Sequence, residues 1–198
     1  TVLLFPFGEQ LVSLSGVLVP EKKGEALADV KKEEELVTRL DPRIFEQPAI
    51  AVAALSNAVA TMGKLTLRNV ERACEVCFTQ DEAVIAEIFE TEKKINAMNR
   101  ELSEYLIKAN TLPVNDHQRL VVADLFNTLT DLERSGDHAE NVAKEVQLLM
   151  TRQLTLSETG KKDLRDMTDA VQEAFRCAVK AREERSVTSA RKVSACED

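Results

Sequence analysis

The sequence predicts an all-α protein: an antiparallel bundle of three long helices followed by the start of a second, truncated repeat of the same unit. Its 198 residues include only six Gly and five Pro, so few positions could turn a β-hairpin and long stretches contain no helix breaker. Within these stretches apolar residues recur at the spacing of one helix face. A hydrophobic content of 44% in a chain of this length can fill a sizeable core.

The first twenty residues, TVLLFPFGEQLVSLSGVLVP, are apolar but interrupted by Pro6 and Glu9. Crossing a bilayer takes about 20 predominantly apolar residues, so this segment cannot span one alone. Because the chain also begins without Met, we expect residues 1–20 to be either the end of a membrane segment or an amphipathic helix at an interface. The charged stretch that follows ends in Pro42 and Pro48, which predicts a linker over residues 21–48.

Residues 49–155 are predicted to form the first three-helix unit. The first helix runs from Ala49 without interruption, and Thr79 to Glu82 resembles a capping box in which Thr79 would cap the second helix. Pro113 separates the second helix from the third. The expected buried stripes comprise Leu55, Val59, Met62, Val70, Ala73 and Cys77; then Val84, Ile88, Ile95, Met98, Leu102, Tyr105 and Leu106; then Val121, Leu125, Leu132, Ala139, Ala143, Val146 and Met150.

Residues 156–198 are predicted to begin a second, truncated unit. Shifting the sequence by about 105 positions places Met62 on Met167 and Glu92 on Glu197, so apolar and acidic positions coincide. Chance similarity between two amphipathic helices is the alternative explanation. If the second unit is cut short, its uncovered apolar stripe could pair with another copy, so a homodimer is among the expected assemblies.

Charge and cysteine content exclude some classes of function. A net charge of -8 and a pI near 5.0 would repel a phosphate backbone, so no nucleic-acid partner is expected. Four cysteines without a secretory signal fit a reducing compartment. Cys74 and Cys77 form a C-x-x-C pair, but His117 and His138 lie far away in the sequence, which favours small core residues over a zinc site.

The densest polar segment is DLERSGDHAENVA, on the third predicted helix. Its Glu133, Asp137 and Asn141 are spaced four apart, so they share one helix face and could present oxygens to a cation. Gly136 weakens a helix relative to Ala, which suggests that another backbone or a ligand approaches closely. The alternative is a solvated charged face in which Arg134 pairs with His138.

On the second predicted helix, Glu92 falls at the edge of the apolar stripe. A buried unpaired charge is expensive, so this acid needs a partner. If the second and third helices are antiparallel neighbours, Glu92 could converge with Glu133 and Asp137 on one metal ion. Otherwise Glu92 reaches solvent or pairs with a neighbouring lysine, Lys93 or Lys94.

These segments resemble a known family. DLERSGDHAENVA is similar to the third helix of PhoU-like domains, in which an E-x-x-x-D pattern, here Glu133 and Asp137, contributes to multinuclear metal sites. LLFPFGEQLVSLSG and LDPRIFEQPAIAV resemble the end of the membrane domain and the linker of bacterial sodium/phosphate cotransporters. The family's second helix usually carries an E-D-x-x-D-like cluster, whereas Lys93 and Asn96 occupy two of those acidic places here. Glu197 and Asp198 match the corresponding cluster of the second repeat.

The resemblance implies a cytoplasmic regulatory domain of a sodium-dependent phosphate transporter, placed at the inner face of the bacterial inner membrane. Its expected partners are the membrane part of the same polypeptide and a signalling protein, and its expected metal is iron, zinc or nickel. The alternatives are a free-standing PhoU-like regulator of phosphate signalling and a structural bundle without metal. The sequence contains no phosphate-cradling Gly-rich loop, H-E-x-x-H or G-x-S-x-G motif, so no enzymatic activity is expected.

Overall fold

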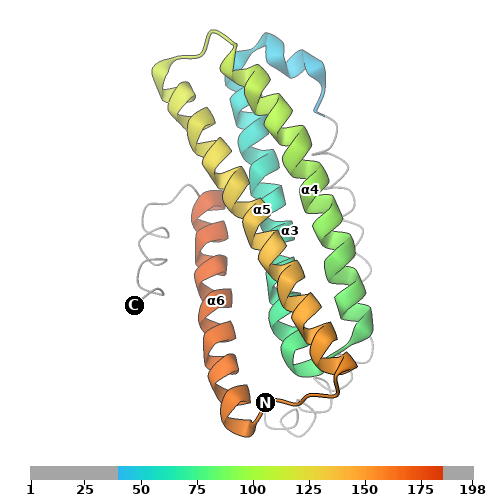
Figure 1. The fold of residues 1–198 in the computed structure, drawn as a ribbon. Helices are drawn as coiled ribbons and strands as arrows, with labels where there is room; N and C mark the ends of the chain where they lie inside the picture. The colour runs from blue at the N-terminus through green and yellow to red at the C-terminus, as the bar shows by residue number, and fades with distance from the viewer. Residues whose placement is uncertain (1–39, 185–198) are drawn as a thin grey trace, which may run out of the picture. The chain divides into compact units, whose positions relative to one another are not determined.

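The computed structural model describes residues 40–184, which contain one 3-10 helix, four α-helices and no β-strand (Figure 1). The elements are η2 (Pro42–Glu46), α3 (Pro48–Thr79), α4 (Glu82–Asn110), α5 (Asp116–Thr151) and α6 (Glu158–Glu184). The all-α prediction is therefore confirmed. Residues 1–39 and 185–198, with the predicted membrane-proximal segment, most of the linker and the acids Glu197 and Asp198, lie outside the described residues.

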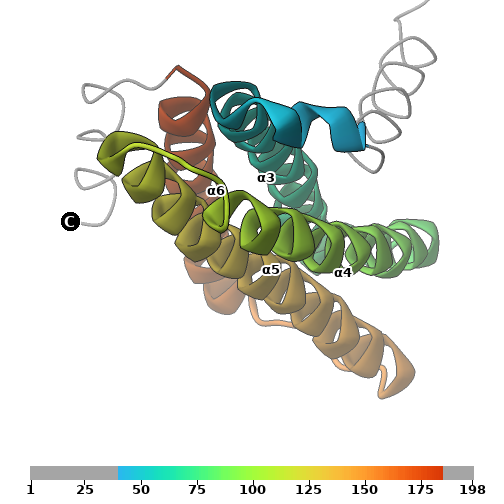
Figure 2. The ribbon, with the colours of Figure 1, turned by 90° about the horizontal axis from the view of Figure 1, so that it is seen from above.

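Helix α3 is the central element of the bundle. It packs against α4, α5 and α6, and α4 also packs against α5 (Figures 1 and 2). The connections from α3 to α4 and from α4 to α5 are short, so these three helices run antiparallel, as predicted. Helix α6 adds a fourth helix beside α3.

Helix ends follow local capping chemistry, with one difference from the sequence prediction. Helix α3 continues through Thr79, whose hydroxyl donates to the Glu75 carbonyl at 3.3 Å, and Gln80 closes the helix in the left-handed region with φ 50°. The cap of α4 is Asp81, whose carboxylate accepts the Ala83 N–H at 2.8 Å. The predicted cap Thr79 is therefore wrong, because that residue belongs to the preceding helix.

The buried apolar side chains form two clusters along the bundle. One includes Leu55, Met62 and Leu102, and the other includes Val76 and Ile88. The predicted stripes are confirmed except that some of their members are only partly buried: Cys77, Val84, Tyr105, Val121 and Met150. Between the two clusters, the buried residues are polar, and this layer contains Thr66, Asn69 and Glu92.

The end of the predicted linker is attached to the bundle. In η2, Phe45 is buried and stacks on Tyr105 of α4 with ring centroids 5.7 Å apart. The Lys108 ammonium lies 4.3 Å from the centre of the Phe45 ring, in cation–π geometry. Residues 42–46 are thus packed on the bundle immediately before α3 begins, and they are not a flexible linker.

The structure shows how far α6 resembles α3. Met62 is fully buried, whereas Met167, its counterpart in the proposed repeat, is 58% exposed. The matched sequence positions therefore do not bury equivalent faces in residues 40–184. Because the rest of the second predicted unit lies outside these residues, the division at residue 156 stays a prediction.

Among the described helices, only α3 is long and apolar enough to cross a membrane by length and composition. Half of its most apolar window is buried, and the helix contacts every other α-helix of the bundle. These contacts identify α3 as the core helix of the bundle.

The cap assignment predicts different effects for two neighbouring substitutions. Asp81→Ala should lower the free energy of unfolding by about 1 kcal/mol, because the first turn of α4 loses its side-chain acceptor. Thr79→Ala should change it by less than about 0.5 kcal/mol, as expected for an exposed helix position. Urea denaturation followed by circular dichroism measures both, and a larger loss for Thr79→Ala would contradict the assignment.

Candidate functional site

Glu92 is the unusual residue of the bundle. It lies on α4 one turn from both Ile88 and Ile95, which are fully buried, and its own side chain is only 3% exposed. Neither carboxylate oxygen accepts a hydrogen bond, and the Asp137 carboxylate lies within hydrogen-bonding reach, where a protonated Glu92 can donate to it. The alternative in which Glu92 reaches solvent or pairs with Lys93 or Lys94 is wrong, because Glu92 is buried, Lys93 pairs with Glu90 at 2.6 Å, and neither oxygen of Glu92 accepts a hydrogen bond from Lys94.

The Glu92 carboxylate lies against the backbone of α5 at Gly136. A Cβ atom at position 136 would lie 3.2 Å from Glu92 Cδ and 3.2 Å from Ile95 Cγ2, and closer still to Glu92 Oε2. Only glycine leaves room for this packing. Side chains of α4, above all Glu92, make the close approach at Gly136, and not the backbone segment or ligand that the sequence predicted.

Two further buried polar residues, Thr66 and Asn69, come from α3. The Asn69 amide donates to the Ile88 carbonyl at 3.4 Å, one turn from Glu92, while Asn69 Oδ1 and Thr66 Oγ1 have no partner. The sequence interpretation missed these residues. The sequence feature that could have predicted them is a pair of polar side chains inside the apolar stripe of α3, between Met62 and Val70.

Electrostatics reinforce the unusual position of Glu92. Burial, and after it the negative charges of Asp137, Glu140 and Glu133 on α5, together raise the pKa of its carboxyl to about 7. Glu133 and Asp137 are therefore near enough to act on Glu92 electrostatically, while their convergence with Glu92 on one metal ion stays a prediction. Glu140, which also faces Glu92, was not predicted, and Asn141 lies exposed on α5.

The polar atoms around Glu92 fit a metal ion only in part. Four buried side-chain oxygens without partners, two of them on Glu92, are the kind of donor that a cation would use. Within residues 40–184, however, no group of three or more His, Cys, Asp or Glu side chains is arranged to hold a metal ion. The metal site at Glu92, Glu133, Asp137 and Asn141 stays a prediction.

The C-x-x-C pair on α3 behaves as part of the core. Cys74 is buried, and this burial raises the pKa of its thiol to about 11, so the thiol stays protonated near neutral pH. Cys77 is partly buried, and both thiols are free. His138, distant in the sequence, lines the same hollow as these two cysteines.

These features define a class of protein: an all-α bundle whose core contains a buried carboxylate opposite an acidic helix face. Comparison with known proteins narrows the class. The PhoU domain family matches residues 59–146, which span most of α3, all of α4 and most of α5.

Curated relatives point the same way. The phosphate-specific transport system accessory protein PhoU homolog 1 of Thermotoga maritima is 28% identical over 131 residues, which cover 63% of this chain and 55% of the relative. A phosphate-specific transport system accessory protein PhoU homolog of Pseudomonas putida is 28% identical over 145 residues, covering 72% of this chain and 55% of the relative. The chain thus spans about half the length of the curated relatives it matches, and no solved structure matches it.

The chain therefore carries a PhoU domain and is distantly homologous to PhoU-like phosphate transport accessory proteins. The resemblance noted in the sequence is confirmed at this level. The prediction of a non-catalytic chain is also confirmed, because PhoU proteins are regulators and not enzymes.

The raised pKa of Glu92 predicts a pH-dependent stability. Since the folded pKa of about 7 exceeds the ordinary value of 4.5, the folded chain holds the proton more tightly, and the free energy of unfolding should fall as pH rises from 4.5 to 7. The fall is on the order of 3 kcal/mol. Glu92→Gln cannot ionise and should remove it, so this variant should gain most over the wild type above pH 7.

Urea denaturation at pH 5 and pH 8 measures this effect. Glu90→Gln, which alters an exposed acid on the same helix, is the control and should keep the pH dependence of the wild type. A Glu92→Gln variant with an unchanged pH profile would contradict the assigned environment.

The Glu92–Gly136 contact predicts opposite effects at two glycines. Gly136→Ala should lower the free energy of unfolding by about 1–3 kcal/mol, because the new methyl group strikes the carboxylate. Gly63→Ala is the matched control on α3: its Cβ would lie 3.8 Å from Leu132 and Val179. At this ordinary contact distance, the better helix propensity of Ala should stabilise the fold by up to about 1 kcal/mol.

A second background isolates the cause. When combined with Glu92→Ala, Gly136→Ala should cost much less than in the wild type, because the group it strikes is gone. Equal costs in both backgrounds, measured by urea denaturation, would show that another contact requires glycine at position 136.

Proposed function

We propose that this chain is an accessory regulator of phosphate transport that acts by binding a transporter or a signalling partner. The match of residues 59–146 to the PhoU domain supports this function most strongly. The matched segment contains Glu92, Gly136 and the acids of α5 that face Glu92, so the family match and the unusual core coincide. The curated relatives are named as accessory proteins of phosphate-specific transport systems.

Two forms of this role are distinguished by how the chain reaches its transporter. The names of the relatives favour a separate accessory protein, docking on a transporter or on a signalling kinase. In the second form, the chain is a domain tethered to a sodium/phosphate cotransporter, as the resemblances of LLFPFGEQLVSLSG and LDPRIFEQPAIAV imply. Both forms place it at the cytoplasmic face of the inner membrane.

Deletion of the gene region encoding this chain should change how phosphate uptake by cells depends on external phosphate. Uptake of radiolabelled phosphate measures this, and complementation with the intact gene is the control. Carbonate washing of membranes then separates the two forms, since a tethered domain stays with the membrane and a separate protein is released. Unchanged uptake at all phosphate concentrations would contradict the proposal.

We further propose a transition metal, iron, zinc or nickel, on the face formed by Glu92, Glu133, Asp137 and Asn141. The carboxylates around Glu92 and its unpartnered oxygens support this proposal. Lys93 and Asn96, where the family pattern has acids, leave fewer anionic ligands and weaken the expected affinity. The structural bundle without metal is the alternative.

Replacing Glu133 and Asp137 together with Ala should abolish metal uptake and leave helicity nearly unchanged, because Ala is the better helix former. Elemental analysis after incubation with each metal measures the uptake. Thermal unfolding is the second readout, since a ligand that binds the folded state raises its stability. Glu145→Ala, an exposed acid on the same helix, is the matched control. No bound metal in the unsubstituted chain would refute the metal proposal and leave the transport role standing.

A further inference from the structure

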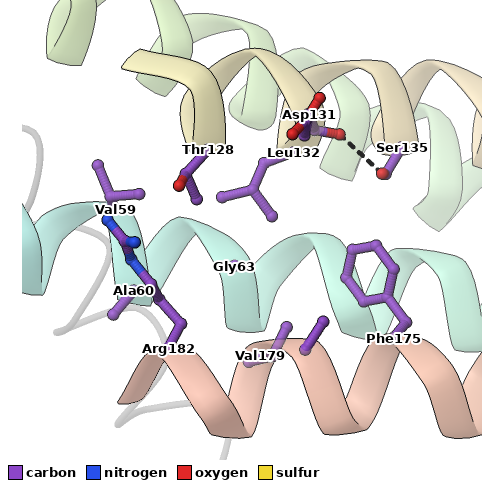
Figure 3. Close-up of a pocket in the computed structure, with 11 residues that line it drawn as sticks. Val59, Ala60, Gly63, Thr128, Asp131, Leu132, Ser135, Phe175, Val179 and Arg182 are labelled. Atoms are coloured by element: carbon purple, nitrogen blue, oxygen red, sulfur yellow. Dashed lines mark hydrogen bonds between the residues drawn. The ribbon is translucent and has the colours of Figure 1, made fainter. Parts of the chain in front are cut away.

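A groove runs along α3 between α5 and α6. Three hollows of about 320, 210 and 290 Å³ follow one another along this line. The first and second share Ala60 and Arg182, and the second and third share Ser135 and Phe175, so the hollows join into one groove. Figure 3 shows its middle part, with α5 and α6 as walls and α3 as the floor.

The groove exists because α6 packs on α3 but hardly on α5. Its floor on α3 is built from small residues, among them Ala60, Gly63 and Cys74. Its walls leave large apolar side chains partly exposed, namely Val142 on α5 and Met167 and Val171 on α6. A floor of small residues between apolar walls has the shape that receives an amphipathic helix.

Helix α6 is held in place mainly by ion pairs along its sides and buries few apolar side chains. Of its described apolar side chains, only Val179 is buried. Ion pairs join α6 to its neighbours: Arg176 to Glu71 of α3 at 2.7 Å, Glu183 to Lys64 of α3 at 2.6 Å, and Arg182 to Asp124 of α5. All of these partners are partly exposed, and exposed ion pairs contribute little stability. Helix α6 is therefore the helix of the bundle that can leave its place at the lowest free-energy cost.

The charges beside the groove define what fits it. The acids Asp124 and Asp131 line its α5 wall, and Glu71 of α3 lies outside the three hollows, in its ion pair with Arg176 of α6. Two basic residues of α6 pair with these acids: Arg176 with Glu71 and Arg182 with Asp124. They lie near the apolar residues Phe175 and Val179 in the sequence of α6. Helix α6 thus presents apolar side chains flanked by basic ones to this surface, and a partner helix with the same pattern would fit it.

We propose that the surface of α3 and α5 which α6 covers, together with the groove beside it, is a docking surface for an amphipathic helix of a partner protein with an apolar edge flanked by Arg or Lys, and that α6 occupies this surface within the chain until the partner displaces it. Undocking of α6 widens the groove and uncovers α3. The partner's basic side chains then take the places of Arg176 and Arg182 on Glu71 and Asp124. This inference rests on the fold alone and does not depend on the phosphate-transport role.

Cys74 reports whether α6 leaves its place. The thiol is 8% exposed and lies beside Gln172 of α6, so a thiol reagent reaches it readily only when α6 undocks. The full chain with Cys77→Ser, Cys177→Ser and Cys196→Ser keeps this single thiol. In that background, Arg176→Ala with Arg182→Ala should speed the labelling of Cys74 about two- to tenfold, as expected from the loss of two partly exposed ion pairs. Glu71→Ala with Asp124→Ala removes the same two ion pairs and should speed it similarly.

Binding of a helix is measured with a fluorescent synthetic peptide of residues 158–184, added to the full chain and followed by anisotropy. Arg176→Ala with Arg182→Ala frees the groove and keeps its acids, so the peptide should bind at least five times more tightly than to the wild type. Glu71→Ala with Asp124→Ala frees the groove but removes the acids, so binding should be at least fivefold weaker than to the arginine variant. Lys161→Ala, which breaks an ion pair within α6, is the control and should change neither readout.

Circular dichroism of each variant verifies that the bundle remains folded. Unchanged labelling of Cys74 in both double variants would overturn the competition by α6. Equal peptide affinity in the two double variants, or no peptide binding to either, would overturn the docking surface. A concentration-dependent dimer without peptide binding would identify a second copy of the chain as the occupant and would also overturn the proposal.

Discussion

The burial of one carboxylate shapes the centre of this bundle. Glu92 of α4 is buried between the two apolar clusters, at the level where α3 contributes Thr66 and Asn69 and α5 contributes Gly136. Its side chain leaves no room for a Cβ atom at position 136, which is glycine. Two further polar side chains, Thr66 and Asn69, are buried at the same level. The apolar core is consequently divided into two clusters, and the helices are joined at a polar layer whose oxygens lack partners.

An unpartnered buried carboxylate is costly for a core whose only task is stability. Proteins tend to keep such local violations at functional positions and to compensate for them elsewhere. Here the compensation is apolar packing on both sides of the polar layer, and the acidic face of α5 lies directly opposite Glu92. The PhoU match covers this part of the chain and leaves out α6, whose loose packing creates the groove. The proposed metal site and the proposed docking surface thus lie in different parts of the bundle.

Periodicity predicted the helices well because burial of one stripe per helix determines their packing. It also predicted that Glu92 would meet Glu133 and Asp137, since antiparallel neighbours bring these positions together. Periodicity did not predict the features that depend on a single contact, namely the cap of α4 and the polar residues around Glu92. Thr79 and Asp81 are both good caps in sequence, and only the extra turn of α3 selects Asp81. Thr66, Asn69 and Glu140 were missed because their meaning depends on one carboxylate arriving from another helix.

The most direct test of this account is the titration of Glu92 itself. The side-chain carboxyl carbon of a ¹³C-labelled glutamate shifts on ionisation, and comparison with Glu92→Gln assigns the resonance by NMR. The account predicts a pKa of about 7 for this carboxyl, far above the ordinary value of 4.5. A titration midpoint near 4.5 would contradict the account, because it would mean that the carboxylate is solvated and that Gly136 and the polar layer need another explanation.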